Sequence, residues 1–85
     1  MSERAQGKKM DIRLPDLGEV AETVIVEWLK NRGDLVDEGE DLVEVETEKT
    51  TFVVASPAPG RVTQIFLTAG ERAQVGDLLG EIEQI

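Results

Sequence analysis

Lys49 is the residue of this sequence whose setting raises a chemical question. It stands near the middle of EVETEKTTFVV, residues 44–54, with valines on one side and bulky strand-forming residues on the other. A free lysine amine has a pKa of about 10.4 and is protonated at neutral pH, so it is a poor nucleophile without help. Any covalent chemistry at this amine therefore has to be driven by a separate enzyme.

The side chains that most often perform catalysis or bind metals are missing. The 85 residues contain no cysteine, histidine or tyrosine. This composition excludes disulfides and cysteine nucleophiles, and it removes the commonest general acid–base group and the usual zinc ligand. The acidic cluster at residues 37–41, DEGED, lacks the alternating ligand pattern of a calcium loop, so we expect a solvated turn and no metal. The chain is predicted not to be an enzyme by itself.

Length and charge narrow the function further. Eighty-five residues suffice for one small domain but not for a catalytic cleft between lobes. The net charge of −9 would repel a nucleic acid, and no apolar run reaches the roughly 18 residues of a membrane span. The polar start MSERAQGKK lacks the apolar core of a signal peptide. We expect a soluble, intracellular, monomeric domain at residues 11–85 behind a disordered leader at residues 1–10.

The apolar pattern predicts an all-β domain. From residue 11 onward, apolar residues alternate or form short runs between turn residues, and no window shows helical spacing. Glycine, proline and asparagine mark the turns. The expected strands cover residues 11–14, 22–30, 35–36, 41–47, 50–55, 61–67, 72–75 and 78–84.

The sequence also repeats itself when it is shifted by 37 positions. Two glycines of each half coincide at this shift, within matching apolar frames, which favours two related half-domains. If a two-fold axis relates the halves, the segment around Lys49 lies at one end of the domain and the chain ends lie at the other. The matched pairs include Gly33 with Gly70, Gly39 with Gly76, Ile25 with Val62, Trp28 with Ile65, Leu29 with Phe66, Leu42 with Leu79 and Val45 with Ile82.

A hairpin centred on Glu48 and Lys49 explains the apolar pattern around the lysine. With these two residues as the loop, apolar side chains meet across the ladder, beginning with Val45 and Phe52. Moving the loop by one residue destroys this match. Glu-Lys does not suit a primed turn, so we expect a type I or slightly wider turn. Taken alone, such an exposed turn is ordinary protein surface.

The order of several motifs indicates a function for the lysine. The chain contains IRLPDLGE at 12–19, ETEKT at 46–50, SPAPGRV at 56–62, and the twin segments GDLVDEGEDL and GERAQVGDLL. In this order, over residues 11–85, they resemble the lipoyl domain of the acyltransferase component of 2-oxo acid dehydrogenase complexes, a member of the biotinyl/lipoyl carrier family. The specificity comes from the ordered set more than from any single motif.

The resemblance implies a fold and a cofactor. The fold is a flattened barrel, a barrel-sandwich hybrid of two four-stranded antiparallel sheets with an internal pseudo-two-fold repeat. The cofactor is lipoate, covalently attached to Lys49, and no residue of the domain is catalytic. The domain would be a swinging arm that carries acyl groups and reducing equivalents in a 2-oxo acid or acetoin dehydrogenase complex. In the family, the loop with Gly18 and Glu19 lies close to the lysine and helps the decarboxylase to recognise its carrier.

The resemblance also implies partners. These are a lipoate-attaching enzyme, a thiamine-dependent decarboxylase, the acyltransferase core and a flavin-dependent dihydrolipoyl dehydrogenase. The parent chain would be a dihydrolipoyllysine-residue acyltransferase. The expected location is the cytoplasm, or the mitochondrial matrix in a eukaryote.

Two alternatives remain beside the lipoyl carrier. The family tip is Glu-Thr-Asp-Lys-Ala, whereas this chain has Glu-Thr-Glu-Lys-Thr at 46–50. Related biotin carriers place the lysine between two methionines, but the neighbours here are Glu48 and Thr50, which makes a biotinyl domain the weaker reading. An unmodified structural domain of the same fold is the other alternative, although such a domain has no need for a lysine at the centre of its tip.

Overall fold

The regular elements of this protein are strands. The computed structural model describes residues 8–18 and 22–84. The described residues include no helix that is long and apolar enough to span a membrane. The strands are β1 (Lys9–Arg13), β2 (Thr23–Trp28), β3 (Leu35–Val36), β4 (Asp41–Thr47), β5 (Thr51–Ala55), β6 (Gly60–Ile65), β7 (Arg72–Ala73) and β8 (Leu78–Gln84).

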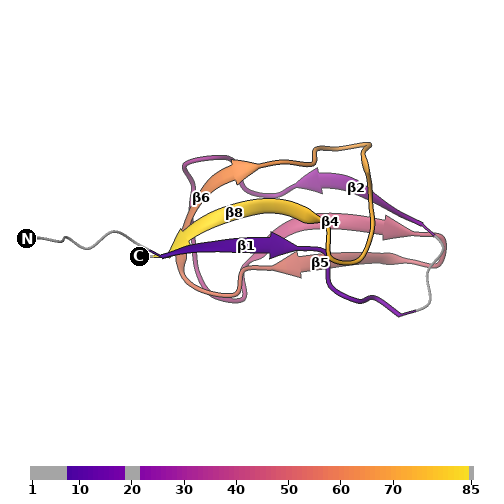
Figure 1. Cartoon of the computed structure of the whole chain (residues 1–85), viewed down its shortest axis with the longest axis horizontal. Coiled ribbons are helices and arrows are strands. Elements are labelled where there is room, and N and C mark those ends of the chain that lie inside the picture. The colour runs from indigo at the N-terminus through magenta and orange to yellow at the C-terminus, as the bar shows by residue number, and fades with distance from the viewer. Residues whose placement is uncertain (1–7, 19–21, 85) are drawn as a thin grey trace, which may run out of the picture.

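These strands form two four-stranded antiparallel sheets, in the orders β1-β8-β6-β3 and β5-β4-β2-β7. Figure 1 shows the two layers stacked, with β8 and β1 in front of β4 and β5. The predicted all-β, flattened barrel-sandwich architecture is therefore confirmed. Each sheet contains strands from both halves of the sequence, so neither half has a complete sheet of its own.

The strand positions agree with the sequence pattern except at their ends. The first strand begins at Lys9, two residues earlier than expected, and Met10 pairs with Ile82 in the sheet. Lys9 and Met10, which the sequence placed in the leader, therefore belong to β1. The Lys8 carbonyl accepts the N–H of Gln84 at 2.7 Å, so the contact with the end of β8 extends one residue beyond β1. Residues 1–7 of the expected leader lie outside the described residues.

The core lies between the two sheets. From Val43 to Thr47 in β4, alternate side chains turn inward, as the period of two in a strand requires, and Leu42, beside a register shift of the ladder, is buried as well. Most of the inward residues are aliphatic, and several are completely buried, so the layers are joined by hydrophobic packing. The largest fully buried side chains are Leu14, Ile25, Leu42, Leu79, Ile82, Val43, Val45 and Val62.

The predicted internal repeat is present in the structure as pseudo-two-fold symmetry. A pseudo-two-fold axis relates one sheet to the other. It carries β2, β3 and β4 onto β6, β7 and β8 at the offset of 37 positions. The Gly33 N–H donates to the Val62 carbonyl at 2.7 Å, and its equivalent, Gly70, donates to Ile25 at 2.8 Å. Both glycines have positive φ, 93° and 91°, which residues with a Cβ seldom adopt.

Carboxylates close the equivalent turns of the two halves. The Asp34 carboxylate accepts the backbone N–H of Asn31 at 2.8 Å, and the Glu71 carboxylate accepts that of Thr68 at 2.8 Å. The backbone hydrogen bond from Thr68 lowers the pKa of Glu71 below its ordinary value. The shared offset thus extends from the apolar frame to the polar contacts that shape the turns.

The acidic cluster at residues 37–41 braces a turn of the first half. The Glu40 carboxylate accepts the backbone N–H of Asp37 at 2.9 Å and forms an ion pair with Lys30. The hydrogen bond with Lys30 is the main cause that lowers the pKa of Glu40, and the same contact raises the pKa of Lys30. Glu40 is therefore used in local structure, in keeping with the expected turn.

Candidate functional site at the β4–β5 turn

The turn between β4 and β5 has the predicted register. Val45 pairs with Phe52, and Glu46 pairs with Thr51, the last pair of the ladder before the turn. Glu48 and Lys49 are thus at the apex, and the Lys49 side chain is exposed. The buried Val45 fixes this register, because a slip by one residue would turn it outward. The sequence prediction of a lysine at the tip of a centred hairpin is confirmed.

The backbone of the turn is shaped by one side chain, Thr47. Its Oγ1 accepts the N–H groups of Lys49 and Thr50, both at 3.1 Å, and donates to the Thr50 carbonyl at 3.0 Å. No residue other than glycine has a positive φ in the part of the chain that is described, so the turn is not of type I′. The prediction that this turn is not a primed hairpin turn is confirmed. The hydrogen bonds of the Thr47 hydroxyl shape the turn instead.

The turn and the described chain ends lie at opposite ends of the molecule (Figure 1). At the far end, the Gln84 N–H donates to the Lys8 carbonyl at 2.7 Å. This contact is the symmetry equivalent of the bond from the Thr47 N–H to the Thr50 carbonyl, at 2.8 Å. The chain is therefore continuous where the lysine turn closes the hairpin, and the two described chain ends meet at the opposite end of the molecule.

A small acidic hollow lies beside the tip. It has a volume of about 180 Å³ and is lined by Glu22, Val24, Glu46, Thr47 and Glu48. The Glu22 carboxylate is paired with the Arg72 guanidinium at 3.0 Å. The surroundings of the exposed lysine are thus rich in carboxylates, which give one face of the tip an acidic character.

The first part of the connection after β1, residues 14–18, runs toward the same end of the molecule as the tip (Figure 1). Within it, Gly18 has a φ of 91°, and its N–H donates to the Asp16 carboxylate at 2.9 Å, so this glycine serves turn geometry. Glu19, which the family resemblance placed near the lysine, lies outside the described residues.

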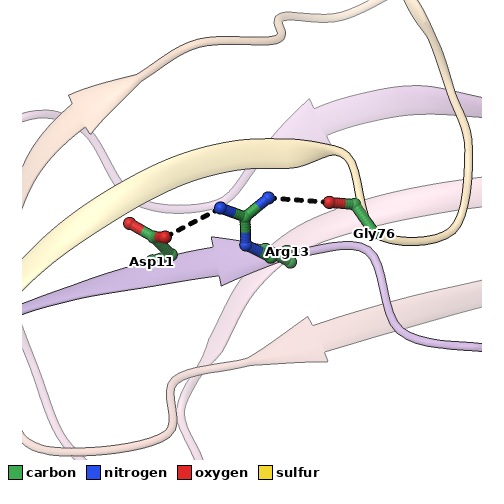
Figure 2. Close-up of polar contacts among 3 residues, drawn as sticks. All are labelled: Asp11, Arg13 and Gly76. Atoms are coloured by element: carbon green, nitrogen blue, oxygen red, sulfur yellow. Dashed lines mark hydrogen bonds and ion pairs between the residues drawn. The ribbon is translucent and has the colours of Figure 1, made fainter.

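Arg13 anchors the start of this connection. Its guanidinium donates to the Gly76 carbonyl at 2.9 Å and to the Asp11 carboxylate at 2.9 Å, as Figure 2 shows. Two backbone bonds between Leu14 and the turn that contains Gly76 and Asp77 add to the anchor. The end of β1 is therefore tied to the turn between β7 and β8, and the connection leaves the sheet from a fixed point.

Sequence reasoning missed the role of Thr47. The hairpin centred on Glu48 and Lys49 leaves Thr47 as the last residue of a strand and gives its hydroxyl no function. A threonine at the end of a strand, directly before the apex, is a known local signal, because such hydroxyls bond to backbone groups of the following turn. ETEKT, residues 46–50, contains this signal.

Comparison with known proteins gives consistent relatives. A family model described as "Biotin-requiring enzyme" matches residues 10–82. The dihydrolipoyllysine-residue succinyltransferase component of the 2-oxoglutarate dehydrogenase complex of Rickettsia conorii is 40% identical over 77 residues, which are 89% of this chain and 20% of that protein. The acetyltransferase component of the pyruvate dehydrogenase complex of Staphylococcus aureus is 36% identical, over 86% of this chain and 17% of that protein. The chain thus spans a fifth or less of these relatives.

A solved structure matches over nearly its whole length. It is the solution structure of the lipoyl domain of the 2-oxoglutarate dehydrogenase complex from Azotobacter vinelandii, with a TM-score of 0.73 and 30% sequence identity. The match covers 88% of this chain and 96% of that one. The similarity therefore extends over most of both chains.

Proposed function

The chain belongs to the lipoyl-domain family, and we propose that Lys49 carries a lipoyl group and that the domain serves as a swinging-arm carrier. The observation that supports this proposal most directly is the position of the amine. Lys49 is exposed at the apex of a centred hairpin, and this hairpin turn lies at the opposite end of the molecule from the described chain ends (Figure 1). A group attached there would extend away from the sheets, and the proposed tether would join the domain at the opposite end.

The residues at the tip fit an amide-linked lipoyl group. The Lys49 side chain is exposed, and the backbone N–H of Lys49 donates to the Thr47 hydroxyl, so the amine is presented on a backbone with a defined shape. When attached, lipoate supplies a cyclic disulfide that accepts an acyl group together with two electrons and later releases both. The described residues include no group of three or more metal-ligating side chains, and the proposed carrier needs none.

The contribution of the chain itself is placement. A tether converts each encounter of the arm with an active site into a quasi-intramolecular event at a high effective concentration. The proposed partners are a lipoate-attaching enzyme, a thiamine-dependent decarboxylase, an acyltransferase core and a flavin-dependent dihydrolipoyl dehydrogenase. The proposed setting is a 2-oxo acid dehydrogenase complex in the cytoplasm, or in the mitochondrial matrix of a eukaryote.

The test is the mass of the domain after coexpression with a lipoate-attaching enzyme in the presence of lipoate. We expect a gain of one lipoyl group, which the variant Lys49→Arg abolishes. The matched control is Lys9→Arg, because Lys9 is also an exposed lysine but lies in β1. A gain that persists in Lys49→Arg, or no gain in the unaltered domain, would contradict the proposal.

The same measurement separates the two alternatives. A biotinyl domain would gain one biotinyl group when it is coexpressed with a biotin-attaching enzyme, and an unmodified structural domain would gain neither group. The residues that flank the lysine, Glu48 and Thr50, favour lipoate, so we expect no gain from the biotin-attaching enzyme.

A further inference from the structure

We propose that Thr47 is the positioning residue of the carrier lysine. Its hydroxyl holds the backbone of Glu48, Lys49 and Thr50 in one turn, and this turn is the form that the lipoate-attaching enzyme binds. The inference rests on the proposed function, because it concerns the same amine. It adds a residue that does not touch the cofactor and acts only through the lysine.

The hydrogen-bonding capacity of this hydroxyl is used entirely within the turn. A threonine hydroxyl can accept two hydrogen bonds and donate one. Thr47 Oγ1 accepts from the Lys49 and Thr50 N–H groups, each at 3.1 Å, and donates to the Thr50 carbonyl at 3.0 Å. The side chain is only 7% exposed, so water competes little for the hydroxyl itself. The Thr47 hydroxyl thus holds the turn together through three hydrogen bonds to its backbone.

The pseudo-two-fold symmetry shows that the sheet does not require this hydroxyl. The residue equivalent to Thr47 is Gln84, and the residue equivalent to Thr50 is Lys8. The backbone bond between the members of each pair is present at both ends of the molecule, at 2.8 Å and 2.7 Å. The hydroxyl bonds occur at the lysine end alone within the described chain. What distinguishes the tip from the scaffold is therefore the Thr47 side chain.

Glu48 and Lys49 do not form one of the turns that tight hairpin loops favour. Tight two-residue hairpin loops favour primed turns, which place glycine, asparagine or aspartate at positive φ. Glu48 and Lys49 have negative φ, and their side chains offer the backbone no such preference. Without the hydroxyl, the Lys49 and Thr50 N–H groups can turn to water, and the exposed loop gains alternative conformations. Only a fraction of the molecules would then present the lysine correctly, and this raises the apparent dissociation constant.

The experiment measures the kinetics of lipoate attachment to the apo-domain by a purified lipoate-attaching enzyme, with the domain as the varied substrate. Thr47→Val removes the hydroxyl and preserves the shape of the side chain. We expect its KM to rise about fivefold with little change in kcat, because a net hydrogen bond shifts a conformational population by a factor of roughly 2 to 12. Thr47→Ser restores the hydroxyl and is expected to restore KM.

The matched control is Thr63→Val. Thr63 is a partly buried threonine in β6 whose hydroxyl donates to the Glu81 carboxylate at 2.9 Å, so the variant also loses a hydroxyl that is engaged inside a strand region. It lies in the other sheet, and we expect its KM to be unchanged. Equal KM values for Thr47→Val and the unaltered domain would overturn the inference, as would a KM that stays high in Thr47→Ser.

A second readout uses no enzyme. Amide hydrogen exchange of Lys49 and Thr50 should be protected in the unaltered domain and should accelerate severalfold in Thr47→Val, while the exchange of the core amide of Val45 stays unchanged. Unchanged exchange at both tip amides would overturn the inference even if the kinetics varied. If the unaltered domain accepts no lipoate, the proposed function fails, and the exchange data still decide whether Thr47 holds the turn.

Discussion

Trp28 and Gly80 show how a change in the size of one residue is matched by an opposite change in its neighbour, so that the pseudo-symmetry is preserved. Their equivalents in the other half are Ile65 and Val43, two side chains of intermediate size. The Trp28 ring lies against Gly80, where an added Cβ would stand 2.6 Å from the ring atom Cη2. The indole N–H donates to the Leu67 carbonyl at 2.8 Å, so its polar atom is satisfied. A large and a small residue thus replace two medium residues.

This packing predicts that Gly80→Ala destabilises the domain by about 1–3 kcal/mol, as overpacked cores do. The new methyl group would meet both the Trp28 ring and the Gln64 carbonyl, each at 2.6 Å. Urea denaturation measures the loss in the free energy of unfolding. Trimming the ring in Trp28→Leu should make the Gly80→Ala substitution less costly in the double variant. An unaltered midpoint for Gly80→Ala alone would contradict the close contact.

At the scale of elements, the β4–β5 hairpin sets the position of the amine. The ladder brings Val45 opposite Phe52 and places the apex between Thr47 and Thr50. The completely buried Val45 and the hydroxyl of Thr47 fix the apex from two sides, one through register and one through backbone hydrogen bonds. Moving the lysine by one position therefore changes its direction without changing the hairpin.

A charge-neutral exchange tests whether placement, and not the mere presence of a lysine, controls modification. The double variant Glu48→Lys with Lys49→Glu keeps the composition and net charge. We expect an unfolding free energy within about 0.5 kcal/mol of the unaltered domain, because both sites are exposed. The rate of lipoate attachment should fall roughly 100-fold, as displaced reacting groups lose that much. Attachment at the unaltered rate would show that the enzyme tolerates either position.

The hairpin also shows what the sequence could and could not predict. The register followed from parity, because only one alignment of the valines with Phe52 builds a buried face. The role of Thr47 did not follow from hydrophobic pattern, since a hydroxyl that bonds to local backbone leaves no period in the sequence. The start of β1 was missed for a related reason. Lys9 and Met10 read as a polar leader, and their pairing with β8 depends on a segment more than 70 residues away.

At the scale of the whole molecule, the two-fold exchanges the β4–β5 turn with the described chain ends. The exchange carries β1 onto β5 at an offset of 42 positions, from Lys9 to Thr51, whereas the other strands have the offset of 37. The difference arises in the connection after β1, which has nine residues, 14–22, against four, 56–59, after β5. The described part of the longer connection, residues 14–18, runs toward the lysine end, so the two ends differ in their surroundings although their ladders match (Figure 1).

Because the ends are equivalent, the chain can be closed at one end and opened at the other. We predict that a circular permutant, with residues 1–7 and 85 removed and Gln84 joined to Lys8 through Glu-Lys, folds when it is opened between Glu48 and Lys49. The linker would complete a hairpin that already has its backbone bond between Gln84 and Lys8. The unfolding free energy should stay within about 2 kcal/mol of the parent, since one two-residue closure replaces another. Chemical denaturation and circular dichroism measure this.

The permutant also tests whether a lysine at a hairpin apex is modified without the residues that surround Lys49. With Lys49→Arg as a background, the linker lysine occupies the equivalent apex but lacks both the Thr47 hydroxyl and the long connection after β1. We expect slow lipoate attachment to this lysine, and a faster rate when Gln84→Thr supplies a hydroxyl at the position equivalent to Thr47. A permutant that fails to fold would contradict the equivalence of the ends. A folded permutant that is modified as fast as the parent would show that a lysine at either apex is sufficient for the attaching enzyme.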